Sequence, residues 1–461
     1  MSKLLFIGLG RIGLPQALVF AKKGFQVFGY DHDSHLQQTL QNKQLPFYEP
    51  HLAEYLHGTL NHTFHPLSTW GAVAEKLPHV DAIFFTLGTS TPDSRLCLEE
   101  NELNLDTIQE TLDKIFQDQR SLKKEIVLIF RTTLPLGSID RLKKYIETHY
   151  HCIEGDDFHL AFVPERLVEG QAIHEEENLP KIVGTYNEKA FSHIKNIFDK
   201  LKGKIIRVTD PKTAEFCKLT DNSFRNTLFA FANEIAMHAA ENKIDVTEVI
   251  DAVNTDYSRN TIQKPGFVSG YCLGKDPYIF EYGFNNQKAA IRNELCSLWY
   301  YGRRTNDHLI EYVVHKIIQK LANVKNPVVT ILGLSFKEDV DDFRMSHAIQ
   351  IIQKLIERGI KRFKVFDPNV GKNKYTTLPD PVAQHVVLQT HYLHEALFEE
   401  SHAVLIAHRH TEVVMANKRK NLAKLLTKLE RPAYLFDAWN VWREASGIAS
   451  IEYDALGWGG V

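Results

Sequence analysis

Residues 4–13 read LLFIGLGRIG, an apolar run followed by glycines at positions 8, 10 and 13. A helix-like stretch follows at once, so the glycine pattern stands between a predicted strand and a predicted helix. In that setting Gly8 allows a tight turn, Gly10 lets a diphosphate approach the backbone, and Gly13 permits close packing of helix and strand. The stretch predicts a dinucleotide-binding turn; the alternative is a tight turn that binds nothing.

The next predicted strand ends in an acidic residue. Asp31 stands 18 residues past Gly13 (31 − 13 = 18), where a carboxylate hydrogen-bonds the ribose hydroxyls of NAD and repels the 2′-phosphate of NADP. Arg11 and His32 are near enough in the sequence to weaken that preference. We therefore predict NAD as the cofactor.

Short apolar runs alternate with helix-like stretches at both ends of the chain. The predicted strands of the first part are residues 4–7, 27–30, 82–86, 126–130 and 160–163. Those of the last part are residues 328–332, 363–366, 403–407 and 434–436. This alternation predicts an α/β protein with two Rossmann-like, doubly wound domains, each a parallel sheet covered by helices on both faces.

The region between these two parts has helical character. Asp210 and Pro211 look like the cap and first residue of a helix that continues to about Lys243, roughly 48 Å at 1.5 Å per residue. Asp245 and Glu248 form a capping-box pattern that predicts a second helix. A helix of that length bridges two domains or packs against a second subunit. We predict domains at 1–209, 210–322 and 323–461.

The composition excludes several classes of protein. Lys and Arg number 54 against 57 for Asp and Glu, so the net charge of −3 gives no overall attraction to nucleic acid or anionic lipid. No stretch reaches the roughly 18 consecutive apolar residues of a membrane-spanning helix, and no signal peptide is recognisable. We expect a cytoplasmic protein with neither a nucleic acid nor a membrane as partner.

Neither the cysteines nor the histidines follow a metal-binding pattern. The five cysteines are widely spaced and include no C-x-x-C pair, which argues against a disulfide scaffold and a cysteine zinc site. The histidine clusters at 149–151 and 408–410 lack the ligand spacing of zinc motifs. We predict no metal.

Two groups of residues could carry chemistry. Lys218 and Asn222 stand four apart on the long helix, so an ammonium and an amide on one face could hold an oxyanion. Cys272, Lys275 and Asp276 are predicted to lie in a loop after residues 264–266, where a thiol can ionise and meet a substrate. From the residues alone, Cys272 could equally be a small core residue, and Lys218 could belong to a solvated helix face.

Over nearly its whole length the chain resembles the UDP-glucose/GDP-mannose dehydrogenase family. The shared motifs occur in the same order along the chain. They are Leu14-Pro15 after the glycine turn, Glu49-Pro50, Gly88-Thr89, residues 131–137 (RTTLPLG), residues 164–170 (PERLVEG), Lys218 with Asn222, Asn233-Glu234, Gly270-Tyr271-Cys272 with Lys275-Asp276, residues 333–337 (GLSFK), residues 341–344 (DDFR) and Asp367-Pro368.

The resemblance implies an enzyme that oxidises the C6 alcohol of a nucleotide sugar to a carboxylate with two NAD. It implies Cys272 as the nucleophile, which forms a thiohemiacetal and then a thioester, while Lys218, Asn222 and Asp276 frame the reacting oxygen. By the same resemblance Glu165 is a candidate base for the hydrolysis, and Thr133 is a contact near the reacting carbon.

The resemblance also implies binding residues and partners. The implied cofactor contacts are Gly8, Gly10, Arg11, Ile12, Gly13, Asp31, Thr89 and Thr133. The implied substrate contacts are Glu169, Arg259, Gly270, Phe336, Lys337 and Arg344. The substrate is a nucleotide sugar, with UDP favoured over GDP, held in part by the C-terminal domain; the long helix forms the interface of a homodimer or a higher homo-oligomer.

Some residues depart from the family pattern. Ser269 and Gly274 replace the usual glycine and proline, which could change the flexibility of the loop. Lys275 before Asp276 resembles the UDP-glucose and GDP-mannose branches, whereas Arg166 resembles the branch that acts on UDP-N-acetylhexosamines, so the sugar stays open. Two other functions also stay open. One is a two-electron dehydrogenase of the hydroxyacid type that uses only Lys218 and Asn222, and the other is a non-catalytic nucleotide-sugar sensor.

Overall fold

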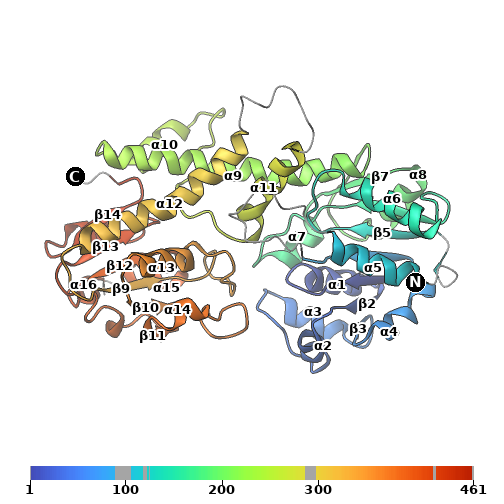
Figure 1. The fold of residues 1–461 in the computed structure, drawn as a ribbon, viewed down its shortest axis with the longest axis horizontal. Helices are drawn as coiled ribbons and strands as arrows, with labels where there is room; N and C mark the ends of the chain where they lie inside the picture. Colours follow the sequence, from blue (N-terminus) through green and yellow to red (C-terminus); the bar gives the residue numbers. More distant parts are fainter. Residues whose placement is uncertain are drawn as a thin grey trace. The chain divides into compact units, whose positions relative to one another are not determined.

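The computed structural model describes residues 2–88, 105–117, 122–123, 125–285, 297–418 and 422–458. The chain divides into two compact units, Met1–Asp221 with Tyr278–Lys288 and Asn222–Pro277 with Ala289–Val461. The long helix α9 (Pro211–Glu241) and helix α11 (Tyr271–Asn285) each run from one unit into the other (Figure 1).

Within its described residues, the first unit contains an eight-stranded sheet in the order β3-β2-β1-β4-β5-β6-β7-β8. The strands are β1 (Lys3–Ile7), β2 (Gln26–Tyr30), β3 (Phe64–Leu67), β4 (Ala82–Phe85), β5 (Ile126–Phe130), β6 (Phe158–Phe162), β7 (Lys181–Thr185) and β8 (Ile205–Val208). All described neighbours are parallel except β6 and β7, which are antiparallel. The five predicted strands of this sheet, β1, β2, β4, β5 and β6, are parallel as predicted, and the antiparallel pair involves β7, which the sequence pattern did not predict.

Helices cover both faces of this sheet because successive strand residues point to opposite sides. Leu5 and Ile7 of β1 belong to a buried cluster with residues of α5 (Asp106–Phe116) and α6 (Ser138–Tyr150). Phe6, from the opposite face, packs against Phe20 of α1 (Gly13–Lys22), which in turn meets Phe198 of α8 (Glu188–Phe198). The other described α-helices of this part are α2 (Ser34–Gln41), α3 (Leu52–Thr59), α4 (Trp70–Ala74) and α7 (Ala172–Asn178).

The described residues of the second unit contain a six-stranded parallel sheet in the order β11-β10-β9-β12-β13-β14. The strands are β9 (Val328–Leu332), β10 (Arg362–Phe366), β11 (Val386–Thr390), β12 (Ala403–Ile406), β13 (Tyr434–Asp437) and β14 (Glu452–Ala455). The two sheets, with the helices α9, α10 and α11 between them in the chain, confirm the predicted fold class of two α/β domains joined by a helical region.

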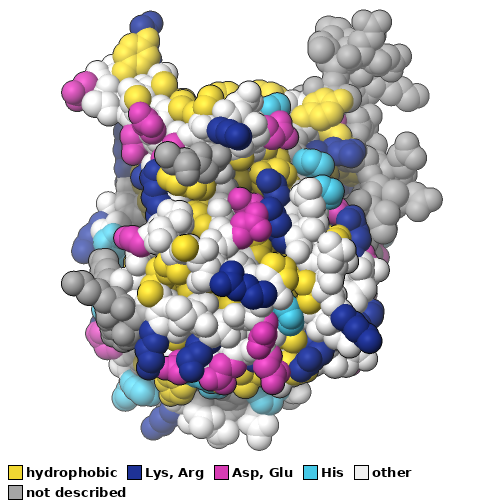
Figure 2. Space-filling model, turned by 90° about the vertical axis from the view of Figure 1, so that its left-hand side faces the viewer, with side chains coloured by type: hydrophobic (Ala, Val, Ile, Leu, Met, Phe, Trp, Pro, Cys, Tyr) yellow, Lys and Arg dark blue, Asp and Glu magenta, His cyan; other side chains and the backbone are white. Residues whose placement is uncertain are grey.

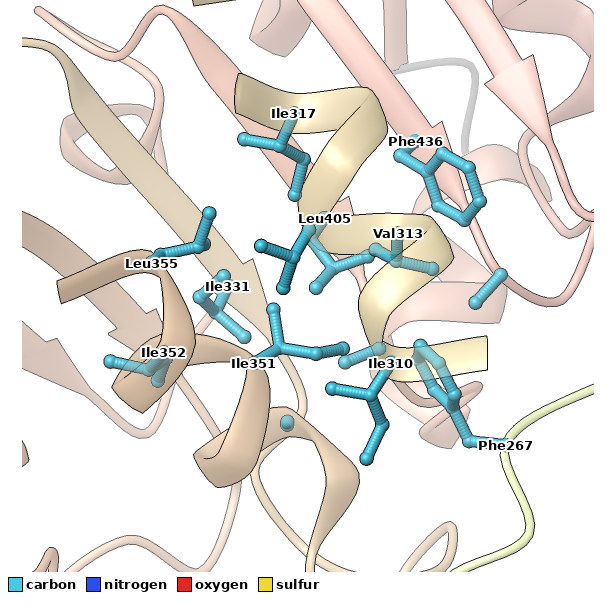
Figure 3. Packing of buried hydrophobic residues seen from close by; sticks show 14 of the residues in the cluster. Phe267, Ile310, Val313, Ile317, Ile331, Ile351, Ile352, Leu355, Leu405 and Phe436 are labelled. Atoms are coloured by element: carbon cyan, nitrogen blue, oxygen red, sulfur yellow. The ribbon is translucent and has the colours of Figure 1, made fainter. Parts of the chain in front are cut away.

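One face of the second sheet is covered by α12 (Leu298–Leu321) and α13 (His347–Glu357). Figure 3 shows Ile310, Val313 and Ile317 of α12 in one buried cluster with Leu405 and Phe436 of the sheet. The opposite face packs against α15 (Thr411–Lys418) and α16 (Leu422–Leu426). Helix α12 therefore shares a core with the C-terminal sheet. The other described α-helices here are α10 (Val246–Asn254) and α14 (Asp380–Ala383).

The helix starts predicted for the central region are confirmed. The Asp210 side chain accepts the N–H of Thr213 at 2.7 Å, and α9 continues to Glu241. Asp245 is the N-cap of α10 and accepts the N–H of Thr247 at 2.9 Å. Each carboxylate satisfies a backbone donor that the first helical turn leaves without a partner.

Five described strands have no counterpart among the predicted ones: β3, β7, β8, β11 and β14. Strands β3, β8, β11 and β14 are the edges of the two sheets. Edge strands are half-exposed, as in β8, where Ile206 and Arg207 are exposed, so they lack the continuous apolar run of a central strand. The edge strands were therefore missed, whereas the central strands other than β7 were found.

The molecular surface mixes charges of both signs. Figure 2 shows lysine, arginine and acidic side chains interspersed on one face. In the C-terminal domain, for example, Lys424 and Lys428 both pair with Glu395. In the described part of the chain, none of the helices has the length and apolar composition needed to cross a membrane.

Candidate active site

The glycine turn joins β1 to α1 at the carboxyl edge of the first sheet. Gly8 has φ of +98°, and a Cβ there would lie 2.6 Å from the carbonyl oxygen of Thr86. A Cβ on Gly13 would lie 2.0 Å from the oxygen of Gly8, whereas a Cβ on Gly10 would meet no atom within 4 Å. Gly8 and Gly13 are thus required by the fold, and Gly10 leaves room for a ligand to approach the backbone.

Thr86, directly after β4, holds this turn, a role that the sequence pattern did not predict. Its hydroxyl donates to the carbonyl oxygen of Gly8 at 2.6 Å. The chain continues from β1 to β2 on one side and from β4 to β5 on the other side. The strand order therefore reverses between β1 and β4, and doubly wound folds bind their ligands at such a reversal. A polar residue directly after a buried strand at this point was the available signal.

Asp31 is oriented toward the glycine turn. Its Oδ2 accepts the N–H of Leu9 at 2.6 Å, and its Oδ1 accepts the N–H of Asp33 at 2.9 Å. Each carboxylate oxygen has a further lone pair that can accept a hydroxyl hydrogen. The residues of the turn therefore fit NAD: the start of α1, with Ile12 as its N-cap, would hold the diphosphate, and Asp31 would hold the ribose.

Arg11 and Glu169, predicted as cofactor and substrate contacts, lie together. Nη1 of Arg11 is 3.2 Å from Oε2 of Glu169, and the guanidinium lies 5.0 Å from the centre of the Phe47 ring. Both charged side chains are mostly buried. The pair places one positive and one negative group next to the glycine turn.

Thr133 follows β5 at the same edge of the sheet and is buried. The preceding Arg131 donates to both carboxylate oxygens of Glu176, at 2.6 and 3.0 Å, and Lys181 donates to the same carboxylate at 3.3 Å. Burial raises the pKa of Glu176, but the two cations outweigh it and the net shift is downward. This buried ionic group fixes the segment that carries Thr133; the sequence offered no signal for the pairing.

Lys218 and Glu165 are brought together by the structure. Nζ of Lys218, on α9, donates to the carbonyl oxygen of Glu165 at 2.7 Å and to its Oε1 at 3.2 Å. Oε2 of Glu165 accepts the N–H of Leu167 at 2.9 Å. Both side chains are buried. An ammonium and a carboxylate in contact, away from bulk water, can pass or share a proton at a reacting oxygen.

Cys272 does not lie in a loop, so that prediction is wrong. It is the second residue of α11 and is partly exposed. Gly270 has φ of +94°, and its carbonyl oxygen accepts the N–H of Gly274 at 3.1 Å, which opens the helix. Gly274 and Pro277 are poor helix formers, so local propensity hid this helix. The thiol lies at a helix N-terminus, where a negative charge is stabilised.

Asp276, on α11, connects two helices of the candidate site in the second unit. Its Oδ2 accepts from Asn222 Nδ2 at 2.5 Å, and its Oδ1 accepts from Lys275 Nζ at 2.6 Å. All three side chains are buried. Burial lowers the pKa of Lys275, but Asp276 and Cys272 raise it, and the net shift is upward. A charged ammonium thus lies near the thiol.

The predicted substrate residues of the C-terminal domain lie on the segment that follows β9. The Arg344 guanidinium pairs with Asp342, with Nη2 2.6 Å from Oδ2, and lies 5.7 Å and 4.7 Å from the ring centres of Tyr271 and Tyr375. It is 42% exposed, so it can still reach a phosphate.

The remaining predicted residues are distributed around this segment. A Cβ on Gly270 would lie 2.5 Å from the Phe336 ring, and Lys337 is partly exposed. Arg259 is exposed, with its guanidinium 4.6 Å from the centre of the Tyr257 ring. Thr89 lies outside the described residues. Among the described residues, no group of three or more His, Cys, Asp or Glu side chains is arranged to hold a metal ion.

Three family models match the chain in succession. Residues 2–202 match the NAD binding domain of the UDP-glucose/GDP-mannose dehydrogenase family, residues 212–307 match its central domain, and residues 330–444 match its UDP binding domain.

Known proteins match along most of the chain. The UDP-N-acetyl-D-mannosamine dehydrogenase of Campylobacter jejuni is 29% identical over 427 residues, covering 91% of this chain and 98% of the relative. The NDP-N-acetyl-D-galactosaminuronic acid dehydrogenase of Ralstonia nicotianae is 28% identical, covering 79% of this chain and 82% of the relative. The solved structure of the UDP-D-ManNAc dehydrogenase of Pyrococcus horikoshii aligns with a TM-score of 0.83 at 25% identity, covering 100% of both chains.

Proposed function

Because this chain belongs to the UDP-glucose/GDP-mannose dehydrogenase family, we propose that it oxidises the C6 alcohol of a UDP-N-acetylhexosamine to the carboxylate, with Cys272 as nucleophile. The observation that carries this proposal is the arrangement around Asp276. A partly exposed thiol at the start of α11 lies four residues before a buried carboxylate that is held by Lys275 and Asn222. Such an arrangement suits covalent chemistry on a carbonyl carbon.

Two NAD molecules, bound one after the other at the glycine turn, would each supply a hydride acceptor for one of the two oxidations. The Lys218 ammonium and the Asn222 amide, one turn apart on α9, stabilise the oxygen of the reacting carbon. The Cys272 thiolate adds to the bound aldehyde as a thiohemiacetal, which keeps the aldehyde from leaving. Oxidation of the thiohemiacetal gives a thioester. A water molecule that Glu165 deprotonates, or that Asp276 orients, then hydrolyses the thioester to the acid.

The choice of sugar rests on the relatives. The Campylobacter and Pyrococcus proteins are described as UDP-N-acetylmannosamine dehydrogenases and the Ralstonia protein as an NDP-N-acetylgalactosaminuronic acid dehydrogenase. We place UDP-N-acetylmannosamine first, with UDP bound by the C-terminal domain near Lys337 and Arg344.

The long helix supports a homodimer as part of the same proposal. Phe224 and Phe231 stand seven residues apart on α9, on one face of the helix, and are 60% and 52% exposed. Two large exposed aromatic side chains in a row are typical of a surface that a partner covers.

A substrate screen tests the function. UDP-N-acetylmannosamine, UDP-N-acetylgalactosamine, UDP-N-acetylglucosamine, UDP-glucose and GDP-mannose are each incubated with NAD, and the NADH formed per sugar consumed is counted. Two NADH per sugar supports the four-electron route. One NADH per sugar supports the two-electron dehydrogenase. NAD binding without turnover on any of the five sugars supports the sensor.

A further inference from the structure

Helix α11 contains a proline whose missing donor is replaced by another residue. Pro277 has no N–H, so the Leu273 carbonyl four residues earlier lacks its normal helical partner. Nη1 of Arg303, on α12, lies 3.3 Å from that carbonyl oxygen. The same nitrogen lies 3.0 Å from the carbonyl oxygen of Val268. Arg303 therefore holds the backbone on both sides of Cys272.

Burying the Arg303 guanidinium is unfavourable, which indicates that the hydrogen bonds it makes to the backbone are important. Arg303 is fully buried, and its counter-charge is Asp307, one turn further along α12, at 2.8 Å. Burying an arginine removes its charge from water, a desolvation cost that a well-packed apolar residue avoids. Its planar fork, however, can bind several acceptors in a fixed geometry, which neither lysine nor an apolar side chain can do.

A network of buried carboxamides holds the other end of the same loop. Asn233 of α9 makes two hydrogen bonds to Gly266, donating to its oxygen at 3.0 Å and accepting from its nitrogen at 2.8 Å. Asn306 of α12 bridges Asn233 and Asn226, at 2.8 and 2.9 Å. Oδ1 of Asn226 also accepts from Arg303 at 3.4 Å. The network thus joins α9, α12 and the loop that leads to Cys272.

The apolar neighbours of the loop keep it against α12. Phe267, between Gly266 and Val268, is buried in the cluster that contains Ile310 of α12, and Figure 3 shows the two side chains close together. With Phe267 packed and the carbonyls of Val268 and Leu273 bound, the segment from Gly266 to Leu273 has little freedom to shift.

We propose that Arg303 is a positioning residue that fixes the Cys272 thiol by supplying the hydrogen bond that Pro277 removes from α11. This inference rests on the proposed role of Cys272 as the nucleophile. Misplacement of a reacting group by about 1 Å can lower a rate by about 100-fold, so loosening of the segment reduces kcat more than it changes the affinity for NAD.

The test compares Arg303→Met, the double variant Arg303→Met with Pro277→Ala, and the control Arg304→Met. The double variant restores an N–H that can bond the Leu273 carbonyl, and Arg304 is the exposed neighbour of Arg303 on α12. We expect Arg303→Met to lower kcat by about 10- to 100-fold with the Kd for NAD unchanged. The double variant regains a measurable part of the loss, and the control keeps the wild-type kcat.

A second readout separates this inference from the proposed function. The rate of alkylation of Cys272 by iodoacetamide is measured as a function of pH by mass spectrometry, which needs no turnover. We expect the alkylation profile to change in Arg303→Met and to return toward the wild-type profile in the double variant. An unchanged profile in Arg303→Met, or no recovery in a folded double variant, overturns the inference. If Arg303→Met does not fold, Arg303→Lys is judged by the same criteria.

Discussion

Asn222 on α9 donates a hydrogen bond across 2.5 Å to the carboxylate of Asp276 on α11, and both side chains are fully buried. The same carboxylate accepts from Lys275, whose ammonium is thereby kept near Cys272. One carboxylate thus positions both an amide and a cation at the start of the helix that carries the thiol.

Asp276→Asn should disrupt this arrangement because it leaves the buried Lys275 ammonium without its counter-charge. We expect the free energy of unfolding to fall by about 3–5 kcal/mol, the range found when one partner of a buried ion pair is removed. Urea denaturation measures this change. Asp276→Asn combined with Lys275→Met should regain stability but not activity; a double variant as unstable as the single one would contradict the argument.

The glycine turn offers a matched pair of substitutions. Gly13→Ala places a Cβ 2.0 Å from the Gly8 oxygen, so it should lower the free energy of unfolding by about 1–3 kcal/mol, as overpacking does. Gly10→Ala meets no atom, so it should leave stability unchanged and weaken NAD binding. Thermal unfolding and an NAD titration of both variants distinguish the two effects. The same loss of stability in both variants would refute the assignment of a structural role to Gly13 and a cofactor-binding role to Gly10.

Asp31→Asn should reduce the preference for NAD over NADP. The amide oxygen can still accept one backbone N–H, but the negative charge that disfavours a 2′-phosphate is gone. We expect NAD binding to weaken by about 1.5 kcal/mol or more, because a hydrogen bond to a charged group is lost. The ratio of NAD to NADP affinity should narrow. Titration of each cofactor measures this ratio, and an unchanged ratio would count against Asp31 as the ribose partner.

The C-terminal domain should lose stability in mildly alkaline solution because of His410. Its imidazole lies 3.1 Å from Asp367 and 3.4 Å from Asp339. Burial lowers the pKa of His410, but hydrogen bonds to Asp339 and Asp367 raise it from 6.5 to about 9. Between pH 6.5 and about 9 the folded state therefore keeps a proton on His410 that the unfolded state has released. The contribution of His410 to the free energy of unfolding is complete below pH 6.5 and disappears as the pH rises through about 9.

Chemical denaturation at several pH values through that range measures the effect. His410→Asn carries no titrating group and should flatten the pH dependence. A wild-type protein whose stability stays constant over the range would contradict the assigned pairing.

The parts of the fold that the sequence predicted are those encoded locally. The strand at residues 126–130 is a continuous apolar run because both of its faces are buried, and the cap at Asp210 marks the start of α9. Strand β8 and the first turns of α11 depend on partners far along the chain. In α11 the Leu273 carbonyl accepts a hydrogen bond from Arg303, 30 residues away. No local sequence pattern predicts that contact.

The candidate site divides in the same way. The glycines and Asp31 form a local motif with a known spacing, so their arrangement was predictable. The contact of Lys218 with Glu165 joins residues 53 apart in the sequence, and the supporting roles of Thr86 and Arg303 also arise from tertiary packing. The domain boundaries at 1–209, 210–322 and 323–461 stay a prediction, as do the roles of the individual site residues.

The most direct test of the account is the product formed by Cys272→Ser. Wild-type protein and the variant are incubated with NAD and UDP-N-acetylmannosamine, and the sugar products are identified by mass spectrometry while NAD binding is measured separately. The account predicts that the variant binds NAD as the wild type does and forms no uronic acid. Uronic acid formed by Cys272→Ser at the wild-type rate would contradict it.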